Sequence, residues 1–228
     1  MKTKRLNILV ALLSALMGLH QAEATTIKNP SFETGDFTDW DIEDLSLASF
    51  PILVEQTGIT PIPALGFFSS DPTDGNYTAM HGFDGNGPGT ISISQDLLIT
   101  DNYINFDYRA AWDMSTFSGS TLARLIDINI EAAGGGTTLL SKNVLAANPQ
   151  TRVLDTGNLT ASIDVSDFIG QTVRFSVDSF VPEAYTGPAF VTIDNFRSSS
   201  APIPEESSSM LLLIIGMSGI LFVPKRKQ

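Results

Sequence analysis

Between Thr25 and Phe196 the sequence consists of short β-type runs separated by glycine, proline, asparagine and aspartate. None of the runs keeps the 3.6-residue spacing of apolar positions that an amphipathic helix requires. Many short strands with turn-forming residues between them are typical of two antiparallel sheets packed face to face. The expected strands are Thr26–Asn29, Trp40–Ile42, Ser49–Glu55, Tyr77–Phe83, Thr90–Leu97, Tyr103–Trp112, Arg124–Glu131, Thr137–Ser141, Leu159–Ile163, Thr172–Phe180 and Ala189–Arg197. The sequence therefore predicts an all-β fold built as a two-sheet β-sandwich.

Three of the expected strands alternate apolar and polar residues, which indicates one buried face and one outer face in each. The outer faces carry Asp107 and Arg109 in the first strand, Asp127 and Asn129 in the second, and Arg174 and Asp178 in the third. If the three strands belong to one sheet, these side chains form a row of charged and amide groups that can hydrogen-bond to sugar hydroxyls. The alternative is an ordinary solvated face.

The charge of the chain limits its partners. Of 13 basic and 25 acidic residues, six basic and three acidic ones lie at the two ends, so residues 25–203 hold 7 basic and 22 acidic residues, a net charge of −15. Such a surface repels nucleic acid and anionic lipid, and it suits divalent cations, neutral glycans or simply solubility. Because the chain has no cysteine, disulfides, thiol catalysis and zinc ribbons are excluded.

Residues 1–24 have the features of a signal peptide. Lys2, Lys4 and Arg5 precede an apolar run over residues 6–19, and small residues stand at Ala22 and Ala24. Signal peptidase cleaves after such a pattern, so we expect cleavage after Ala24. The alternative, a retained anchor, is disfavoured because the run is shorter than the roughly 20 residues of a membrane span.

The two ends of the β-domain carry a resemblance to a known fold. Residues 29–33 read N-P-S-F-E, Gly35 and Trp40 follow, residues 164–175 read D-V-S-D-F-I-G-Q-T-V-R-F, and residues 193–196 read I-D-N-F. Together these segments resemble the jelly-roll of non-catalytic carbohydrate-binding modules. The resemblance implies adjacent first and last strands and a structural Ca²⁺ held by Glu33 and Asp194. Calcium needs six to eight oxygen ligands, which backbone carbonyls and water would complete. Alternatively, the two carboxylates only bind backbone amides.

The C-terminal tail carries a second resemblance. After a Ser/Pro linker at residues 198–203 come Pro204, Glu205 and a second glutamate, then an apolar helix expected at residues 210–223, then Lys225, Arg226 and Lys227. This tripartite tail, residues 204–228, is similar to the PEP-CTERM sorting signal of Gram-negative bacteria that make exopolysaccharide, although the family has Pro-Glu-Pro where this chain has Pro-Glu-Glu. The resemblance implies processing by an integral-membrane exosortase. A plain C-terminal anchor is the alternative.

Catalytic chemistry finds little support in the sequence. His20 lies in the expected signal peptide, which leaves His81 as the single histidine of the mature chain. No Gly-x-Ser-x-Gly elbow accompanies it, and a lone histidine within a strand is usually structural. The many acidic residues allow carboxylate pairs of the kind that glycoside hydrolases use, but none stands out.

These observations predict a non-catalytic protein. It is expected to be exported, held briefly in the inner membrane through the tail, and then released to the cell surface or extracellular matrix of a Gram-negative bacterium. Its expected domain is a jelly-roll over residues 25–197, and its expected partners are an exosortase-type enzyme and extracellular polysaccharide, with no nucleic acid. The alternative is an exported glycan-active enzyme, a hydrolase or lyase, on the same scaffold.

Overall fold

The computed structural model describes residues 25–116 and 119–204. The described strands are β1 (Asp41–Glu43), β2 (Leu53–Gln56), β3 (Tyr77–Gly82), β4 (Gly89–Leu98), β5 (Tyr103–Asp113), β6 (Arg124–Ala132), β7 (Thr138–Ala147), β8 (Arg152–Val153), β9 (Leu159–Asp164), β10 (Thr172–Val181) and β11 (Ala189–Ser199), with short 3₁₀ turns η1 (Pro63–Leu65) and η2 (Ser166–Phe168). The expected signal-peptide residues Ala22 and Ala24 lie outside the described part of the chain. So do the expected helix at residues 210–223 and the tail residues Glu205, Lys225, Arg226 and Lys227.

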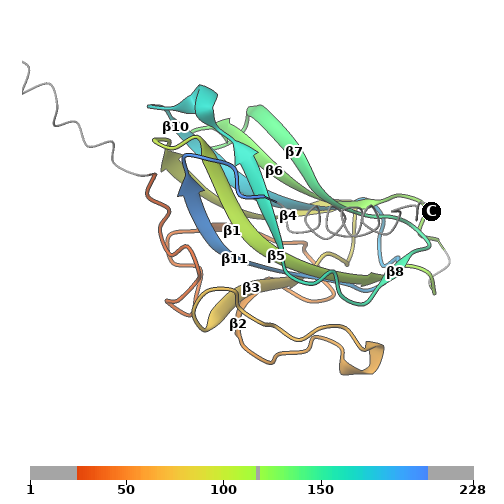
Figure 1. The fold of residues 1–228 in the computed structure, drawn as a ribbon. Helices are drawn as coiled ribbons and strands as arrows, with labels where there is room; N and C mark the ends of the chain where they lie inside the picture. The colour runs from red at the N-terminus through yellow and green to blue at the C-terminus, as the bar shows by residue number, and fades with distance from the viewer. Residues whose placement is uncertain (1–24, 117–118, 205–228) are drawn as a thin grey trace, which may run out of the picture.

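The strands form two antiparallel sheets, one above the other in Figure 1. The five-stranded sheet has the order β1, β4, β10, β6, β7. The six-stranded sheet has the order β2, β3, β11, β5, β8, and β9 also pairs with β5. This is the predicted jelly-roll β-sandwich. Neither of the two helical turns within residues 25–116 and 119–204 is long and apolar enough to cross a membrane.

The first expected strand, Thr26–Asn29, is wrong, because a side chain takes the place of a neighbouring strand. Gln95 on β4 accepts a hydrogen bond from Lys28 N at 2.9 Å and donates one to Lys28 O at 3.1 Å. The backbone then turns away through Asn29 and Phe32, both of which have positive φ angles. The other expected strands each overlap an observed strand, and β7 runs six residues beyond its expected end at Ser141.

The N-terminal segment meets the last strand, as predicted, but it is not itself a strand, and the first strand, β1, belongs to the other sheet from β11. Phe196 N donates to Pro30 O at 2.9 Å, and the rings of Trp40 and Phe196 lie 4.7 Å apart. Phe196 also contacts Phe106 of β5 and Phe175 of β10, at 5.2 and 5.8 Å between ring centroids. The residues around Phe196 therefore connect the N-terminal segment to both sheets through the buried core, where each fully buried aromatic ring contributes roughly 1.5–3 kcal/mol.

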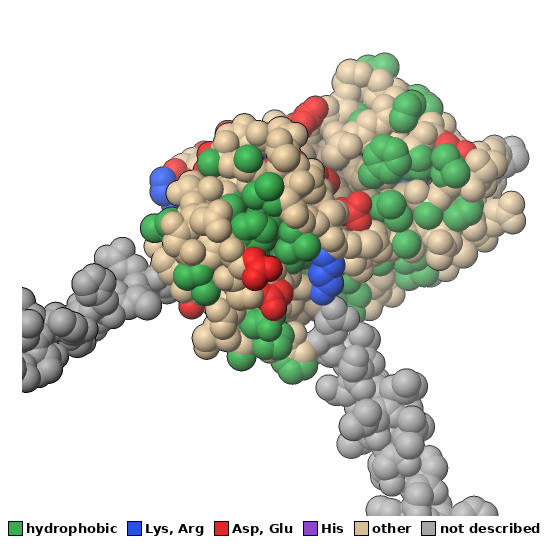
Figure 2. All heavy atoms as spheres, turned by 90° about the horizontal axis from the view of Figure 1, so that it is seen from above, with side chains coloured by type: hydrophobic (Ala, Val, Ile, Leu, Met, Phe, Trp, Pro, Cys, Tyr) green, Lys and Arg blue, Asp and Glu red, His purple; other side chains and the backbone are tan. Residues whose placement is uncertain are grey.

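The outer faces of the two sheets differ. On the six-stranded sheet a small second cluster of apolar residues packs beneath the connection between β2 and β3: Phe67, Phe68, Met80, Ala111 and Phe190. That face is therefore partly covered. The outer face of the five-stranded sheet presents mainly hydroxyl, amide and carboxylate side chains. Lysine and arginine are also sparse on the face shown in Figure 2.

Candidate functional site

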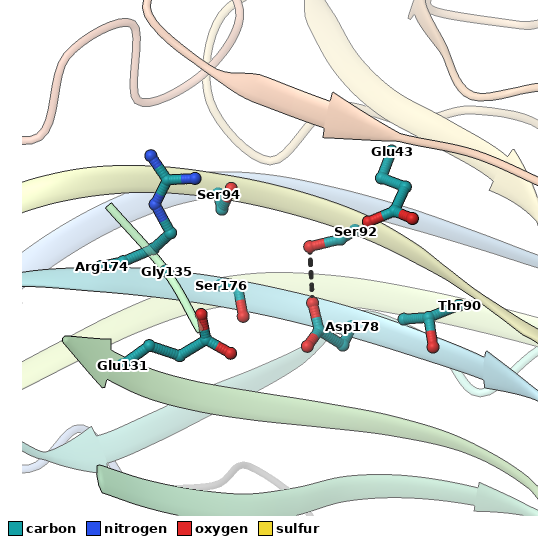
Figure 3. Close-up of a pocket in the computed structure, with 9 residues that line it drawn as sticks. All are labelled: Glu43, Thr90, Ser92, Ser94, Glu131, Gly135, Arg174, Ser176 and Asp178. Atoms are coloured by element: carbon teal, nitrogen blue, oxygen red, sulfur yellow. Dashed lines mark hydrogen bonds between the residues drawn. The ribbon is translucent and has the colours of Figure 1, made fainter. Parts of the chain in front are cut away.

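A groove of about 380 Å³ lies on the outer face of the five-stranded sheet. We call it the polar groove, and its lining residues are Glu43, Thr90, Ser92, Ser94, Glu131, Gly135, Arg174, Ser176 and Asp178 (Figure 3). These residues come from β1, β4, β6 and β10, and from the turn after β6. Their alternate neighbours, such as Ile91, Ile93 and Val177, are buried in the core. The same period-two alternation that buries one face thus places these polar side chains on the other.

Strand register aligns the polar residues in rows across the sheet. Glu43 pairs with Ser92, Ser92 with Asp178, and Asp178 with Asp127. Facing residues on neighbouring strands of a sheet have side chains close enough to interact. Strand pairing therefore brings residues that are far apart in sequence together on one continuous polar surface.

Asp178 is at the centre of a hydrogen-bond network in the groove. Ser92 Oγ donates to Asp178 Oδ1 at 2.6 Å, and Asn129 Nδ2 donates to Asp178 Oδ2 at 2.7 Å. Asn143 Nδ2 donates in the same way to Asp127 Oδ1 at 2.7 Å. Hydrogen bonds to an ionised carboxylate are stronger than those between neutral groups, so this network holds the side chains in place.

Arg174 is the single arginine or lysine among the lining residues of the polar groove, and two carboxylates already engage it. Its Nε donates to Asp96 Oδ1 and its Nη2 to Asp41 Oδ2, both at 2.8 Å. The hydrogen bond that Arg174 donates to Asp96 raises the pKa of Arg174 and lowers the pKa of Asp96. Arg174 therefore links β10 to β4 and β1.

Ser176 is notable among the groove residues because its hydroxyl is buried and has no hydrogen-bond partner among the described residues. Its side chain lies between Glu131 and Asp178 (Figure 3), and the residue is 3% exposed. A buried hydroxyl without a partner costs about 1–3 kcal/mol. Such a group at the floor of a groove becomes available to a ligand when a neighbouring side chain moves aside.

Phe180 lies at the end of the groove. It is the next outward residue after Asp178 on β10, and it pairs with Thr90, which lines the groove. At 39% exposure it presents part of its ring to solvent. An exposed aromatic face beside hydrogen-bonding groups can pack against the apolar face of a ring-shaped ligand.

The predicted row of six residues is divided between the two sheets. Asp127, Asn129, Arg174 and Asp178 share the outer face of the five-stranded sheet, as expected for β6 and β10. The assumption of one common sheet is wrong for β5, so Asp107 and Arg109 lie in the six-stranded sheet. Strand pairing places β5 in the other sheet. One common sheet would need β5 beside β6 or β10, but β5 pairs with β11, and β10 lies between β4 and β6.

Asp107 and Arg109 form contacts within the six-stranded face. Asp107 accepts hydrogen bonds from Thr160 Oγ1 at 2.7 Å, Asn195 Nδ2 at 2.8 Å and Arg197 Nη2 at 2.9 Å. Arg109 donates two hydrogen bonds to Asp155, and its guanidinium lies 4.9 Å from the ring centre of Phe68. Both side chains thus have partners that fix the packing of this face.

The two predicted metal ligands, Glu33 and Asp194, flank the same loop. Asp194 Oδ2 accepts hydrogen bonds from Thr73 N at 2.7 Å and Asp74 N at 3.0 Å. Glu33 Oε1 accepts from two amides further along the loop, Asn76 N at 2.8 Å and Tyr77 N at 2.9 Å. Burial raises the pKa of Asp194 to about 6, although the hydrogen bonds it accepts act in the opposite direction. In this arrangement the carboxylates hold the loop through its backbone amides.

The described residues offer no group of three or more His, Cys, Asp and Glu side chains placed to hold a metal ion. The donors around Asp194 are N–H and O–H groups, which suit an anion rather than a cation. Calcium at Glu33 and Asp194 stays a prediction. If it binds there, adding EDTA to the purified protein is expected to lower its melting temperature, because the ion stabilises the native state by mass action. An unchanged melting temperature in EDTA contradicts the prediction.

His81 lies in the interior between the two sheets. It is 1% exposed, and its Nε2 lies 3.3 Å from Ser179 Oγ. Burial lowers the pKa of His81 to about 4. The imidazole is therefore neutral near pH 7 and has no exposed face through which it could meet a substrate.

Sequence reasoning missed the contributions of β1 and β4 to the groove. A signal was present, since Thr90, Ser92 and Ser94 alternate with Ile91, Ile93 and Gln95. What the alternation does not give is the order of strands, which decides that β4 lies beside β10. No comparable alternation in the sequence marks Glu43 or Gly135 as groove residues.

No protein-family model matches the chain, and no curated protein sequence matches it either. Solved structures of similar architecture include TmCBM61 in complex with β-1,4-galactotriose, which is 16% identical, with 77% of this chain and 97% of that chain covered and a TM-score of 0.46. A non-crystalline cellulose specific carbohydrate-binding module, CBM28, is 13% identical over 78% of this chain and 96% of its own, with a TM-score of 0.45. The K1 cleaved adhesin domain of Lys-gingipain from Porphyromonas gingivalis W83 is 11% identical over 79% and 100%, with a TM-score of 0.45. The likeness concerns architecture alone, so the function of this chain is inferred from its own residues.

Proposed function

We propose that this chain is an exported, non-catalytic protein of the cell surface or extracellular matrix that binds polysaccharide through the polar groove. The observation that carries the proposal is the Ser176 hydroxyl, buried at the floor of the groove without a partner. Sugar rings present hydroxyl groups around their edges and apolar C–H groups on their faces. The groove has carboxylate and hydroxyl groups for the first, and Phe180 stands beside it for the second.

The groove favours binding over catalysis. Both oxygens of Asp178 already accept hydrogen bonds, from Ser92 and Asn129. A carboxylate fixed in this way is a good acceptor for a sugar hydroxyl, whereas a general acid must hold and release a proton. The alternative of a glycan-active enzyme would use the same groove, where Glu43 and Glu131 are further carboxylates. Release of new reducing ends from a polysaccharide incubated with the protein would favour the enzyme.

Substitution of Ser176 with alanine tests the binding proposal. Because the hydroxyl has no partner in the protein, we expect Ser176→Ala to leave the melting temperature unchanged or raise it. Loss of one hydrogen bond to a ligand, about 0.5–1.5 kcal/mol, corresponds to a roughly two- to tenfold weaker interaction. Affinity electrophoresis in gels that contain glucan, galactan or mannan measures it, as the retardation of the protein by the polymer.

Ser162→Ala is the matched control. The Ser162 hydroxyl is also buried without a partner among the described residues, but it lies on β9 in the six-stranded sheet. We expect this variant to be retarded as strongly as the unchanged protein. Equal retardation of Ser176→Ala and the unchanged protein, or no retardation of the latter in any gel, contradicts binding in the groove.

Both ends of the described chain support an exported, processed protein. Thr25 N donates to Asp101 Oδ2 at 3.1 Å, and Ser198 Oγ donates to the same oxygen at 2.6 Å. Cleavage after Ala24 would turn the Thr25 N–H into an ammonium that faces this carboxylate. At the other end, Ile203 and Pro204 lie beside Asp107 and Arg197 of the six-stranded sheet, away from the polar groove. A chain held through its tail would therefore keep the groove open.

We infer that the tail is a sorting signal that an exosortase removes. The apolar run at residues 211–223 would span about 20 Å as a helix, roughly two-thirds of a hydrocarbon core, which suits temporary retention better than a permanent span. Mass spectrometry of the exported protein is expected to find Thr25 as the first residue and an end near Pro204. A mature form that still contains residues 211–228 would identify a simple anchor instead.

A further inference from the structure

We propose that the polar groove selects glycans with free amino groups over neutral and acidic glycans. The inference rests on the proposed glycan binding and adds the class of sugar. It depends on the balance of charge in the groove and on the carboxylates that lie around Ser176.

The groove is strongly acidic. Its lining includes Glu43, Glu131 and Asp178, and the same face carries Asp41, Asp96 and Asp127 beside it. Arg174, the arginine among the lining residues, already binds Asp41 and Asp96. The contacts that the structure shows for the other carboxylates come from neutral donors, such as Ser92, Asn129 and the Gly136 amide. A uronic acid or sulfate would therefore meet uncompensated negative charge, which costs binding energy.

The groups around Ser176 form a set of acceptors. The carboxylates of Glu131 and Asp178 lie on either side of the Ser176 hydroxyl (Figure 3). Glu131 is held by one long hydrogen bond, from Gly136 N at 3.3 Å, so its side chain can move aside for a ligand. An ammonium group carries three N–H donors and no acceptor, and it can donate to all three of these groups. An N-acetyl group carries no positive charge, so it forms no ion pair with Glu131 or Asp178.

The unpartnered Ser176 hydroxyl separates this groove from an ordinary acidic surface. Clusters of acidic residues on a protein are usually solvated and need no ligand. A hydroxyl that is buried at their centre without a partner is costly unless a ligand bonds to it. The Ser176 hydroxyl lies between two carboxylates. This position points to a ligand that is both a hydrogen-bond donor and a cation.

The test compares sugar hexamers that differ in their substituents. Titration calorimetry with the full-length chain, in mildly acidic buffer where sugar amines are protonated, would use the β-1,4-linked glucosamine hexamer, its N-acetylated form, cellohexaose and hexagalacturonate. We expect the glucosamine hexamer to bind about tenfold more tightly than the two neutral hexamers, a difference of about 1.4 kcal/mol, because two ion pairs add to the hydrogen bonds. We expect the preference to fall as salt rises, and hexagalacturonate not to bind.

Two double variants separate the groove from the charge of the whole protein. Glu43→Gln with Glu131→Gln removes two charges from the groove, and Glu55→Gln with Asp167→Asn removes two charges from β2 and η2. We expect the first pair to bring the glucosamine and N-acetylated hexamers to within about twofold of each other. We expect the second pair to keep the preference of the unchanged protein.

Each other outcome overturns a defined part of the inference. If the N-acetylated hexamer binds as tightly as the glucosamine hexamer, glycan binding stands and the selection for amines is wrong. If the control pair loses as much preference as the groove pair, the attraction comes from net charge and not from the groove. If no hexamer binds, the proposed glycan binding itself fails.

Discussion

Replacing Arg124 with methionine is expected to lower the free energy of unfolding by about 3–5 kcal/mol. Arg124 begins β6 with its side chain fully buried, and it connects two loops at one end of the sandwich. Its Nη1 donates to Phe83 O at 2.9 Å and Gly187 O at 2.6 Å. Its Nη2 donates to Asp84 Oδ1 at 2.9 Å and Thr186 Oγ1 at 2.8 Å.

The size of the effect follows from burial. Burial raises the pKa of Asp84 and lowers the pKa of Arg124, even though each group stabilises the charge of the other. Both charges are therefore tolerated only as a pair. Arg124→Met would leave Asp84 as a buried charge with no cation beside it and two backbone carbonyls without their donor, which is far costlier than loss of a surface ion pair.

Urea unfolding of three variants checks this explanation. Arg152→Met is the control, because Arg152 pairs with Asp113 while 47% of its side chain is exposed, and we expect a loss of about 0–1 kcal/mol. Arg124→Met combined with Asp84→Leu is expected to recover part of the lost stability, since both charges are then gone. If Arg124→Met costs no more than Arg152→Met, the buried pair is not the connection described here.

Replacing His81 with glutamine is expected to make the protein relatively more stable in acid, by about 3 kcal/mol. The pKa of His81 is lowered from 6.5 to about 4 in the folded protein because the imidazole is buried. Below pH 6.5 the unfolded state thus binds more protons than the folded state. The contribution of His81 to the free energy of unfolding is greatest above pH 6.5, falls as the pH drops toward 4, and does not change further below pH 4. His81→Gln removes the contribution of His81 to the pH dependence of stability.

The difference in stability between His81→Gln and the unchanged protein is more informative than the pH dependence of either protein alone. Asp194 acts in the opposite direction to His81 in both. Its pKa is raised from 3.8 to about 6, so the folded state binds more protons and gains stability as the pH falls through 6 toward 3.8. The two effects oppose each other, and other carboxylates, such as Asp96, Asp113 and Asp155, have lowered pKa values, so the unchanged protein alone does not isolate the effect of His81. Urea unfolding in EDTA is expected to show the difference between His81→Gln and the unchanged protein growing from above pH 6.5 to below pH 4. A constant difference would contradict a neutral, buried His81.

Local patterns in the sequence determined which residues face the core. Ile126, Ile128 and Ile130 are buried as their alternation predicts, and Asp127 and Asn129 face outward. Side chains on successive residues of any strand point to opposite faces, so this result needs no knowledge of neighbouring strands. The close approach of the N-terminal segment to Phe196 also followed from short motifs at the two ends of the domain.

Local patterns gave no information on which strands are neighbours. Asp107 and Asp127 have the same alternation in sequence, yet β5 and β6 belong to different sheets. The failure at Thr26–Asn29 has a similar origin, because Gln95, 67 residues away from Lys28, supplies the hydrogen bonds that a strand would have supplied.

The sequence by itself thus determined the class of fold, the core-facing positions of β6 and β10 and the acidic balance of the domain, because each depends on residue type and on spacing along the chain. Only the tertiary structure decided that β4 lies between β1 and β10, that Ser176 is buried between Glu131 and Asp178, and that Arg124 meets Asp84. Those contacts join residues far apart in sequence. They depend on the order in which strands pair, which is set by the packing of the whole core and by no single segment.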